Sequence, residues 1–253
     1  MPHLAADGHS LDYVVHGDAA GPGTLVFLHE GLGSIGLWRR FPDELRQRTR
    51  RAGVVYSRYG YGWSDVAPEA RRPDYMHHEA LVVLPTVLDA LDVRRPVLVG
   101  HSDGASIALI ATGAGVVDVE RLVLLAPHVF VEDVSIIGIE AARAAYETTD
   151  LPARLARHHR DADATFRGWN DIWLAPEFRA WNIEGYLGGV TCPLLCIQGL
   201  DDQYGTLAQL DAIVAGVAGP WERMELAECG HSPQLDRPEA TLDAVSRACR
   251  RVP

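Results

Sequence analysis

The sequence predicts an α/β protein with a doubly wound, mostly parallel sheet and a helical insertion over one edge of it. Three observations favour this class: the strand candidates are continuously apolar, helical patterns alternate with them, and one long segment interrupts the alternation. Continuous apolar runs are typical of strands that are covered on both faces, as in parallel sheets. With 253 residues, 47% of them hydrophobic, the chain is long enough to bury one large core.

Apolar, β-rich runs form the predicted central strands: Thr24–His29, Val54–Ser57, Pro96–Gly100, Arg121–Ala126, Pro193–Gly199 and Glu222–Leu226. An earlier segment, Leu11–His16, is expected to add an antiparallel strand at one edge. Helical patterns lie between the strands, at Leu37–Arg48, Tyr75–Leu91, Ala105–Ala114, Thr206–Ala218 and Pro238–Arg250. This alternation of strand and helix is the pattern that a doubly wound sheet produces.

One long segment, residues 128–189, carries helical patterns and many large aromatic residues but no convincing strand. We predict that it forms a helical cap on a core made by residues 1–127 and 190–253. Trp169 and Trp173 are four residues apart, so a helix would present both on one face. They fill the interface between cap and core or line an apolar pocket, and the two roles are compatible.

The charge pattern excludes several classes of protein. Lysine is absent and all 23 basic residues are arginine, which rules out a P-loop lysine, a lysine Schiff base and a lysine nucleophile. The 34 acidic residues give a formal net charge of -11, which argues against nucleic acid and anionic lipid as partners. No apolar run approaches the roughly 18 residues that span a bilayer, and the first residues lack a signal-peptide pattern, so a cytoplasmic protein is expected.

The sequence offers no metal site or cofactor motif. The four cysteines lack CxxC spacing and nearby histidine pairs, so we expect reduced thiols, although sequence alone does not exclude a disulfide: Cys192, Cys196, Cys229 and Cys249. His77 and His78 are adjacent, so a helix would point them about 100° apart and not at one metal. We therefore expect no cofactor, a small molecule as partner, and no nucleic acid or membrane. A homodimer is compatible with the sequence.

The most informative motif is Gly100-His101-Ser102-Asp103-Gly104, which follows a predicted strand and precedes a predicted helix. In a G-x-S-x-G motif at such a junction, the serine occupies a strained turn, and the flanking glycines let strand and helix approach closely. The start of the helix also directs its N–H groups at developing negative charge. Ser102 is the predicted nucleophile, and the backbone N–H of Asp103 is predicted to form part of an oxyanion hole.

Candidates for the other two catalytic groups follow in the chain order Ser, Asp, His. His231 lies on a loop beyond the last predicted strand, where it would take the Ser102 proton and deliver it to the leaving group. The strand Pro193–Gly199 runs into Asp201 and Asp202, either of which would fix the tautomer of the histidine. Chemistry alone does not choose between these two aspartates.

From Leu25 to the C-terminus, the pattern resembles the α/β-hydrolase superfamily. Within it, the sequence is most similar to the valacyclovirase-like (biphenyl-hydrolase-like) serine hydrolases. Four segments carry the resemblance: Ser102-Asp103-Gly104, Gly31-Leu32-Gly33-Ser34, Phe130-Val131-Glu132-Asp133 and Cys192-Pro193. The first of these is specific to the superfamily, and it implies the α/β-hydrolase fold with a helical cap.

The resemblance also implies roles for individual residues. The catalytic acid of the family usually lies three residues after the glycine that corresponds to Gly199, which implies Asp202. The oxyanion loop of the family implies Gly31 as the second N–H donor, with Glu30 in a place where glycine is customary. In the subgroup, the aspartate after the nucleophile is associated with a substrate ammonium group, which makes Asp103 a candidate selectivity residue. Alternatively, the Asp103 side chain caps its helix or pairs with an arginine.

Together, these residues predict a carboxylic ester hydrolase that forms an acyl-enzyme on Ser102. A lactonase or a C–C bond hydrolase would use the same triad, and a ligand receptor that retains the hydrolase scaffold is an alternative of another class. His128, where the cap begins, either faces the pocket or is a structural histidine. The predicted substrate-binding residues are Glu30, Asp103, His128, Trp169 and Trp173.

Overall fold

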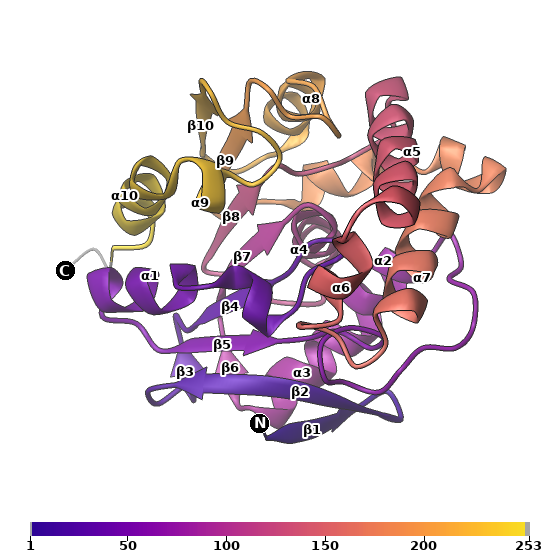
Figure 1. Cartoon of the computed structure of the whole chain (residues 1–253). Coiled ribbons are helices and arrows are strands. Elements are labelled where there is room, and N and C mark those ends of the chain that lie inside the picture. Colours follow the sequence, from indigo (N-terminus) through magenta and orange to yellow (C-terminus); the bar gives the residue numbers. More distant parts are fainter. Residues whose placement is uncertain (1, 251–253) are drawn as a thin grey trace.

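The computed structural model describes residues 2–250 and contains the predicted sheet (Figure 1). Its eight strands pair in the order β1-β2-β5-β4-β7-β8-β9-β10. In chain order their bounds are β1 His3–Ala6, β2 His9–His16, β4 Leu25–Leu28, β5 Gly53–Tyr56, β7 Val97–His101, β8 Arg121–Leu125, β9 Leu194–Gly199 and β10 Trp221–Leu226. The β1–β2 and β2–β5 pairs are antiparallel, and all pairs from β5 to β10 are parallel. The predicted fold class is therefore confirmed.

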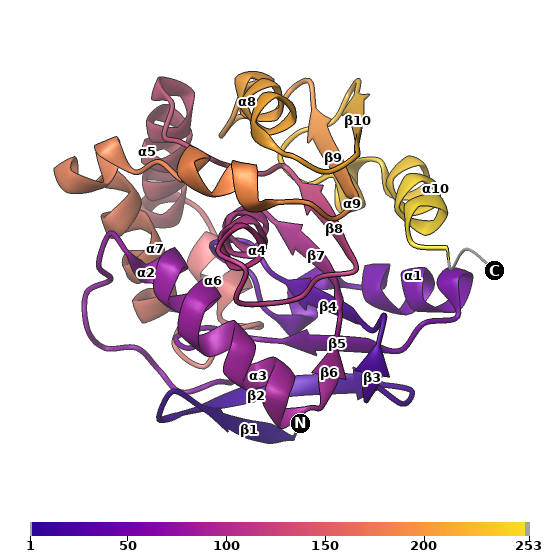
Figure 2. The same ribbon diagram turned by 180° about the vertical axis from the view of Figure 1, so that it is seen from behind.

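Two apolar layers pack against this sheet because side chains alternate between its faces. In β4, Leu25 and Phe27 belong to one layer, whereas Val26 and Leu28 belong to the other. Helices on both faces cover these layers (Figure 2): α1 Phe41–Thr49 and α10 Pro238–Ala248 on one face, and α3 Leu84–Ala90, α4 Asp103–Gly113 and α8 Ala208–Gly216 on the other. This double covering explains why the strand sequences are continuously apolar.

One predicted helix begins later than its sequence pattern. The apolar pattern of Leu37–Arg48 becomes a 3-10 turn at Ile35–Trp38, followed by α1 from Phe41. Arg39, between the two, has a φ of 52°, a left-handed conformation that ends the turn. Pro42 then occupies the first turn of α1, where its missing N–H costs no hydrogen bond.

A second predicted helix, Tyr75–Leu91, contains a local irregularity. It consists of α2 (Tyr75–His78), a π-helical turn (Glu79–Val83) and α3, which follow one another without a gap. Pro85 lies in the first turn of α3 and has no N–H to donate to the preceding turn. The wider π-helical turn lies directly before the proline and accommodates this break in the hydrogen-bond ladder.

Three short strands have no counterpart among the predictions. The strand β1 pairs outside β2, so β2 is not the edge strand that the sequence suggests. The other two, β3 (Gly21–Pro22) and β6 (Val93–Arg94), form a separate two-stranded sheet. Strands of two residues leave no periodicity to recognise in a sequence.

The segment between β8 and β9 is helical, as its sequence pattern indicates. It contains α5 (Asp133–Thr148), α6 (Leu151–Leu155) and α7 (Ala162–Leu174), which lie together on one side of the sheet in Figure 1. Two 3-10 turns, Pro176–Ala180 and Glu184–Gly189, lead back to the sheet. Within residues 2–250, no helix is both long and apolar enough to cross a bilayer.

The entry to α5 is tied to the loop that follows β9. The Glu132 carboxylate accepts hydrogen bonds from the Thr206 backbone N–H at 2.9 Å and from the Thr206 hydroxyl at 2.6 Å. It also accepts a hydrogen bond from the Gln209 side-chain amide at 2.7 Å. In addition, the Ser135 hydroxyl donates to the Tyr204 carbonyl at 2.6 Å. The first residues of α5 and the loop from Tyr204 to Gln209 are therefore held as one unit.

Candidate active site

Ser102 lies at the tight turn between β7 and α4. Its φ of 52° and ψ of -118° are unusual for a residue with a side chain, and such strain is typical of functional sites. A Cβ at Gly104 would overlap the Leu28 carbonyl oxygen, and a Cβ at Gly100 would lie 2.5 Å from the Gly104 carbonyl oxygen. The two glycines therefore allow the close approach of strand and helix that the turn at Ser102 requires.

Asp202 and His231 form a hydrogen-bonded pair. The Nδ1 atom of His231 lies 2.9 Å from each carboxylate oxygen of Asp202. The same carboxylate accepts hydrogen bonds from the Gln198 amide at 2.7 Å and from the Tyr204 backbone N–H at 2.8 Å. Asp201, by contrast, is exposed.

The charge of Asp202 is stabilised by these contacts. Burial raises the pKa of the Asp202 carboxyl, but the charge and hydrogen bond of His231 and the Tyr204 N–H outweigh burial and keep that pKa below its usual value. Asp202 is therefore a carboxylate at neutral pH. It accepts the Nδ1–H of His231, which leaves Nε2 of the imidazole to act as a base.

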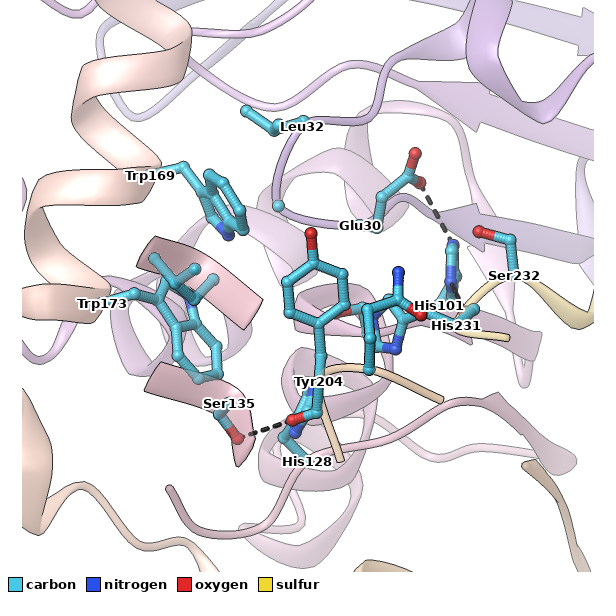
Figure 3. Close-up of a pocket in the computed structure, with 14 residues that line it drawn as sticks. Glu30, Leu32, His101, His128, Ser135, Trp169, Trp173, Tyr204, His231 and Ser232 are labelled. Carbon is cyan, nitrogen blue, oxygen red and sulfur yellow. Dashed lines mark hydrogen bonds and ion pairs between the residues drawn. The ribbon is translucent and has the colours of Figure 1, made fainter. Parts of the chain in front are cut away.

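Ser102 and His231 open onto one pocket of about 160 Å³ (Figure 3). The pocket also brings together most of the residues that the sequence singled out, namely Glu30, Gly31, His128, Trp169 and Trp173. In Figure 3 the two tryptophans project from α7 toward the loops of the sheet, and Tyr204 lies between them and His231. The pocket is thus built by α5 and α7 on one side and by the segments at the carboxyl ends of β4, β7, β8, β9 and β10 on the other.

The sequence predicts an oxyanion hole made by the N–H groups of Gly31 and Asp103. Gly31 lines the pocket, and a Cβ at Gly31 would overlap the indole nitrogen of Trp169, so glycine is required where α7 meets this loop. Asp103 is the first residue of α4, and its N–H therefore has no partner within the helix. Among the described residues, neither N–H has a hydrogen-bond acceptor.

The Asp103 side chain does not reach the pocket, contrary to the prediction that it binds substrate. Its carboxylate is fully buried and accepts a 2.6 Å hydrogen bond from the Tyr75 hydroxyl. Arg58 lies 3.8 Å from the same oxygen, as the alternative of an arginine pair anticipated. The Trp173 indole N–H donates to the Tyr75 hydroxyl at 3.1 Å, so Tyr75 and Trp173 separate Asp103 from the pocket.

His128 lies in the wall of the pocket and is 2% exposed. Its ring centroid lies 5.4 Å from that of His231 and 5.4 Å from that of Trp173. Burial lowers the pKa of His128 to about 3, and the nearby His231 ring adds to this effect. His128 is therefore a neutral imidazole, and its Nδ1 has no hydrogen-bond partner among the described residues.

Three residues that contact this site were not among the sequence candidates: His101, Gln198 and Tyr204. Gln198 is fully buried within the apolar strand β9, and such a polar residue in an apolar run is a signal that the sequence did offer. Tyr204 packs edge-on against His231 with ring centroids 4.8 Å apart, a contact that no local pattern reveals. Across the described chain, no cluster of three or more His, Cys, Asp or Glu could hold a metal ion, and all four cysteines are free thiols.

Solved structures of hydrolases match this fold along nearly its whole length. An enol-lactonase from Burkholderia xenovorans LB400 has a TM-score of 0.77 and 20% identity, covering 97% of this chain and 98% of that chain. A meta-cleavage product hydrolase, CumD from Pseudomonas fluorescens IP01, has a TM-score of 0.76 and 17% identity, covering 98% of this chain and 96% of that chain. The esterase EaEST from Exiguobacterium antarcticum has a TM-score of 0.73 and 17% identity, covering 98% of each chain.

At these identities the structural similarity establishes the fold alone, and the three enzymes are named for different substrates. No curated protein sequence matches this chain. A family model, described as the alpha/beta hydrolase family, matches residues 25–244, which include the turn at Ser102 and the pair formed by Asp202 and His231. This chain belongs to the alpha/beta hydrolase family.

Proposed function

We propose that the protein hydrolyses a carboxylic ester of a small molecule through an acyl-enzyme. The observation that carries this proposal is the Asp202–His231 pair, at 2.9 Å, beside a strained serine that opens onto the same pocket. Ser102 attacks the ester carbonyl while His231 takes its proton, and His231 then returns the proton to the departing alcohol. In the second half-reaction, His231 activates water, which releases the acid and regenerates Ser102.

The N–H groups of Gly31 and Asp103 stabilise the oxyanion of both tetrahedral intermediates in this proposal. Both are main-chain donors on segments fixed by packing, which is what preorganised stabilisation requires. We further propose that residues 128–189 act as the cap of a core made by residues 1–127 and 190–253. In that division, Trp169 is the cap residue that closes over Gly31.

The pocket favours a small substrate with an apolar or aromatic part. Its volume of about 160 Å³ lies below the roughly 300 Å³ at which sites for drug-sized ligands begin. Trp169, Trp173 and the neutral His128 supply an apolar wall. Trp173 and His128 pack edge-on, and this contact holds the two rings of that wall in a fixed orientation.

We also propose a preference for esters that carry an ammonium or another N–H or O–H donor, as in the valacyclovirase-like group that the sequence resembles. Glu30, and not the buried Asp103, supports this part of the proposal because its side chain lines the pocket and is 25% exposed. One oxygen of Glu30 faces His101, and the other has no partner among the described residues. A carboxylate oxygen in a partly dry pocket attracts a donor and repels an anionic acid.

Lactone hydrolysis is the second candidate. The enol-lactonase from Burkholderia xenovorans shares this fold over nearly the whole chain, and a lactone is a cyclic ester that would be opened by the same nucleophile. C–C bond cleavage, which the meta-cleavage product hydrolase suggests, fits less well for any acidic substrate, because the partly exposed carboxylate of Glu30 would repel it.

The test is steady-state hydrolysis of matched p-nitrophenyl esters, one set with a free α-amino group and one acylated, alongside small γ-lactones. We expect wild type to turn over at least one ester set and Ser102→Ala to abolish turnover. Ser10→Ala, on the β1–β2 hairpin, is the matched control and should behave as wild type. Turnover of lactones alone would replace the ester proposal with the second candidate, and turnover of neither class would remove both.

A further inference from the structure

His101 is a buried ring at which three segments of the candidate site meet. It directly precedes Ser102 and is 1% exposed. Its Nε2 lies 2.7 Å from the His231 carbonyl oxygen, and its Nδ1 lies 3.3 Å from Oε2 of Glu30. Gln234, which follows His231 by three residues, also contacts Nδ1 at 3.1 Å. One side chain therefore links the nucleophile turn, the loop of Gly31 and the loop of His231.

The partners of His101 require protons on both ring nitrogens. A carbonyl oxygen only accepts hydrogen bonds, so Nε2 must donate to His231. A carboxylate likewise only accepts, so Nδ1 must donate to Glu30. A protonated Nδ1 needs the oxygen end of the Gln234 amide toward it, whereas the nitrogen end lies there, at 3.1 Å, and Oε1 is buried without a partner. Amide ends are assigned from such contacts, and exchanging them lets Oε1 accept the Nδ1–H.

The charges around His101 support the same protonation state. Burial lowers the pKa of His101, but the hydrogen bond and charge of Glu30 and the His231 carbonyl outweigh burial and raise that pKa above its usual value. The His101 ring in turn outweighs burial of Glu30 and lowers the pKa of its carboxyl. His101 and Glu30 therefore form an ion pair at the wall of the pocket.

We propose that this His101 cation is a positioning residue that holds the oxyanion loop and the catalytic histidine in their places relative to Ser102. The inference rests on the hydrolase function proposed above. Among the described residues, His101 is the only donor to the His231 carbonyl, so this bond fixes the main chain at the general base. The Glu30 contact fixes the neighbour of Gly31 in the same way. Both connections start from the residue that precedes the nucleophile.

The charge of His101 also acts on His231, whose ring centroid lies 5.3 Å away. The charged and titratable groups that face the two rings are Glu30 from the loop after β4, Asp202 and Tyr204 from the loop after β9, and His128 from the loop after β8, with Arg58 behind Glu30. If His101 loses its charge while the carboxylates of Glu30 and Asp202 remain, the surroundings of the general base become more negative. We expect the acidic limb of kcat/KM to move to higher pH as a result.

Two isosteric substitutions separate the two connections. The amide nitrogen of glutamine reaches the position of Nε2, so His101→Gln keeps the bond to the His231 carbonyl. The amide nitrogen of asparagine reaches the position of Nδ1, so His101→Asn keeps only the Glu30 contact. We expect His101→Asn to lower kcat on the order of 10²-fold, as misplacement of a catalytic group does, and His101→Gln to lower it less. In both variants the acidic limb should move to higher pH.

The matched control is His78→Gln, because His78 pairs with Asp7 at 2.6 Å, is half-exposed, and does not line this pocket. It should leave kcat and the pH profile as in wild type. Unfolding temperatures of all variants show whether a lower kcat reflects lost stability alone. If both His101 variants keep the wild-type kcat and pH profile, the proposal is wrong.

A measurement without substrate keeps this proposal separate from the hydrolase assignment. Histidine NMR of wild type should show His101 as an imidazolium at pH 7, and Glu30→Gln should make it lose its proton at lower pH because the stabilising carboxylate is gone. A neutral His101 in wild type at pH 7 would overturn the proposal, whether or not any ester is hydrolysed. Absence of ester turnover with a cationic His101 would instead overturn only the proposed function.

Discussion

The Tyr75 hydroxyl lies 2.6 Å from Oδ2 of Asp103 and seals that carboxylate away from the pocket. The Trp173 indole donates to the same hydroxyl from the pocket side, at 3.1 Å. Arg58 lies 3.8 Å from the same oxygen, and Asp103 is fully buried. The residue after the nucleophile therefore belongs to a buried polar network, and only its backbone N–H is directed at chemistry in the proposed mechanism.

Removal of the tyrosine hydroxyl should destabilise the fold. In Tyr75→Phe, the buried Asp103 carboxylate loses the one direct hydrogen bond that it makes within residues 2–250, which we expect to cost about 1–3 kcal/mol of unfolding free energy. Urea denaturation followed by fluorescence measures this loss. Tyr59→Phe is the control, because the Tyr59 hydroxyl bonds Glu69 at 3.2 Å in an exposed position. Equal effects of the two substitutions would contradict a special role for the buried contact.

Selectivity for amino esters should depend on Glu30 and not on Asp103. We expect Glu30→Gln to lower the ratio of kcat/KM for amino esters to that for acylated esters, because the pocket loses its exposed carboxylate. Asp103→Asn should leave this ratio unchanged even if both rates fall. The ratio is measured on the matched p-nitrophenyl esters. A selective loss in Asp103→Asn would mean that Asp103 reaches the substrate when the pocket is occupied.

The contact between Gly31 and Trp169 predicts a coupled pair of substitutions. Gly31→Ala places a methyl group into the indole and should displace the oxyanion loop, with a loss of kcat/KM on the order of 10²-fold. Trp169→Ala removes the obstacle. The double variant should therefore recover activity relative to Gly31→Ala, which a double-mutant cycle of kcat/KM detects. Additive losses would show that Gly31 is required for its own backbone conformation.

Glu79 should make stability depend on pH. Burial raises the pKa of Glu79 in the folded state, and the opposing charges of Arg58 and Arg71 do not cancel this effect. The folded protein then binds the proton more tightly than the unfolded chain. The free energy of unfolding therefore falls as pH rises from the pKa of this carboxyl in the unfolded chain to its pKa in the folded protein. Glu79→Gln should be more stable than wild type at pH 8, and this difference should vanish below pH ~4, the range of an unperturbed glutamate. Urea midpoints at the two pH values test the sign of the stability difference between Glu79→Gln and wild type. That sign would be reversed if the arginines held Glu79 as an ion.

Substitutions of the adjacent aspartates Asp201 and Asp202 should differ sharply in their effect on kcat. Asp202→Asn lets the amide donate to Nδ1 of His231 and leaves the wrong tautomer, so we expect kcat to fall by about 10⁴-fold, as in other serine triads. Asp201→Asn changes an exposed side chain of the same loop and should keep at least half of the activity. Similar losses in both would show that the net charge of the loop matters, and not the hydrogen bond to His231.

The sequence allowed the centre of the sheet to be predicted well because β4, β5, β7, β8 and β9 are buried on both faces and are therefore continuously apolar. The residues of the candidate site were predictable where they stand next to a local signal, as Ser102 does between two glycines that the packing requires. His231 and the adjacent aspartates Asp201 and Asp202 could be found because they lie on loops that follow strands, and the family resemblance then favoured Asp202. Signals of this kind lie in neighbouring residues and are therefore visible in the sequence.

Features that depend on contacts between distant segments were not predictable in this way. The orientation of Asp103 is decided by Tyr75 and Arg58, which come from other parts of the chain. The bond between His101 and His231 joins residues that are 130 positions apart. The helix start at Phe41 depended on the backbone conformation of Arg39, which arginine does not signal.

The Glu132 carboxylate, with its hydrogen bonds to Thr206 and Gln209, also bears on how substrate enters. Because the start of α5 is fastened to the loop that holds Asp202, movement of the insertion at that end would disturb the acid of the pair. The segment that leads into α7 is also fastened to the core, because His159 bonds Gly62 and Leu32, and Thr165 bonds Gly60. The helical segment is therefore tied to the core at two separate places. We expect substrate to enter through movement of individual side chains such as Trp169, while the hydrogen bonds of Asp202 stay intact.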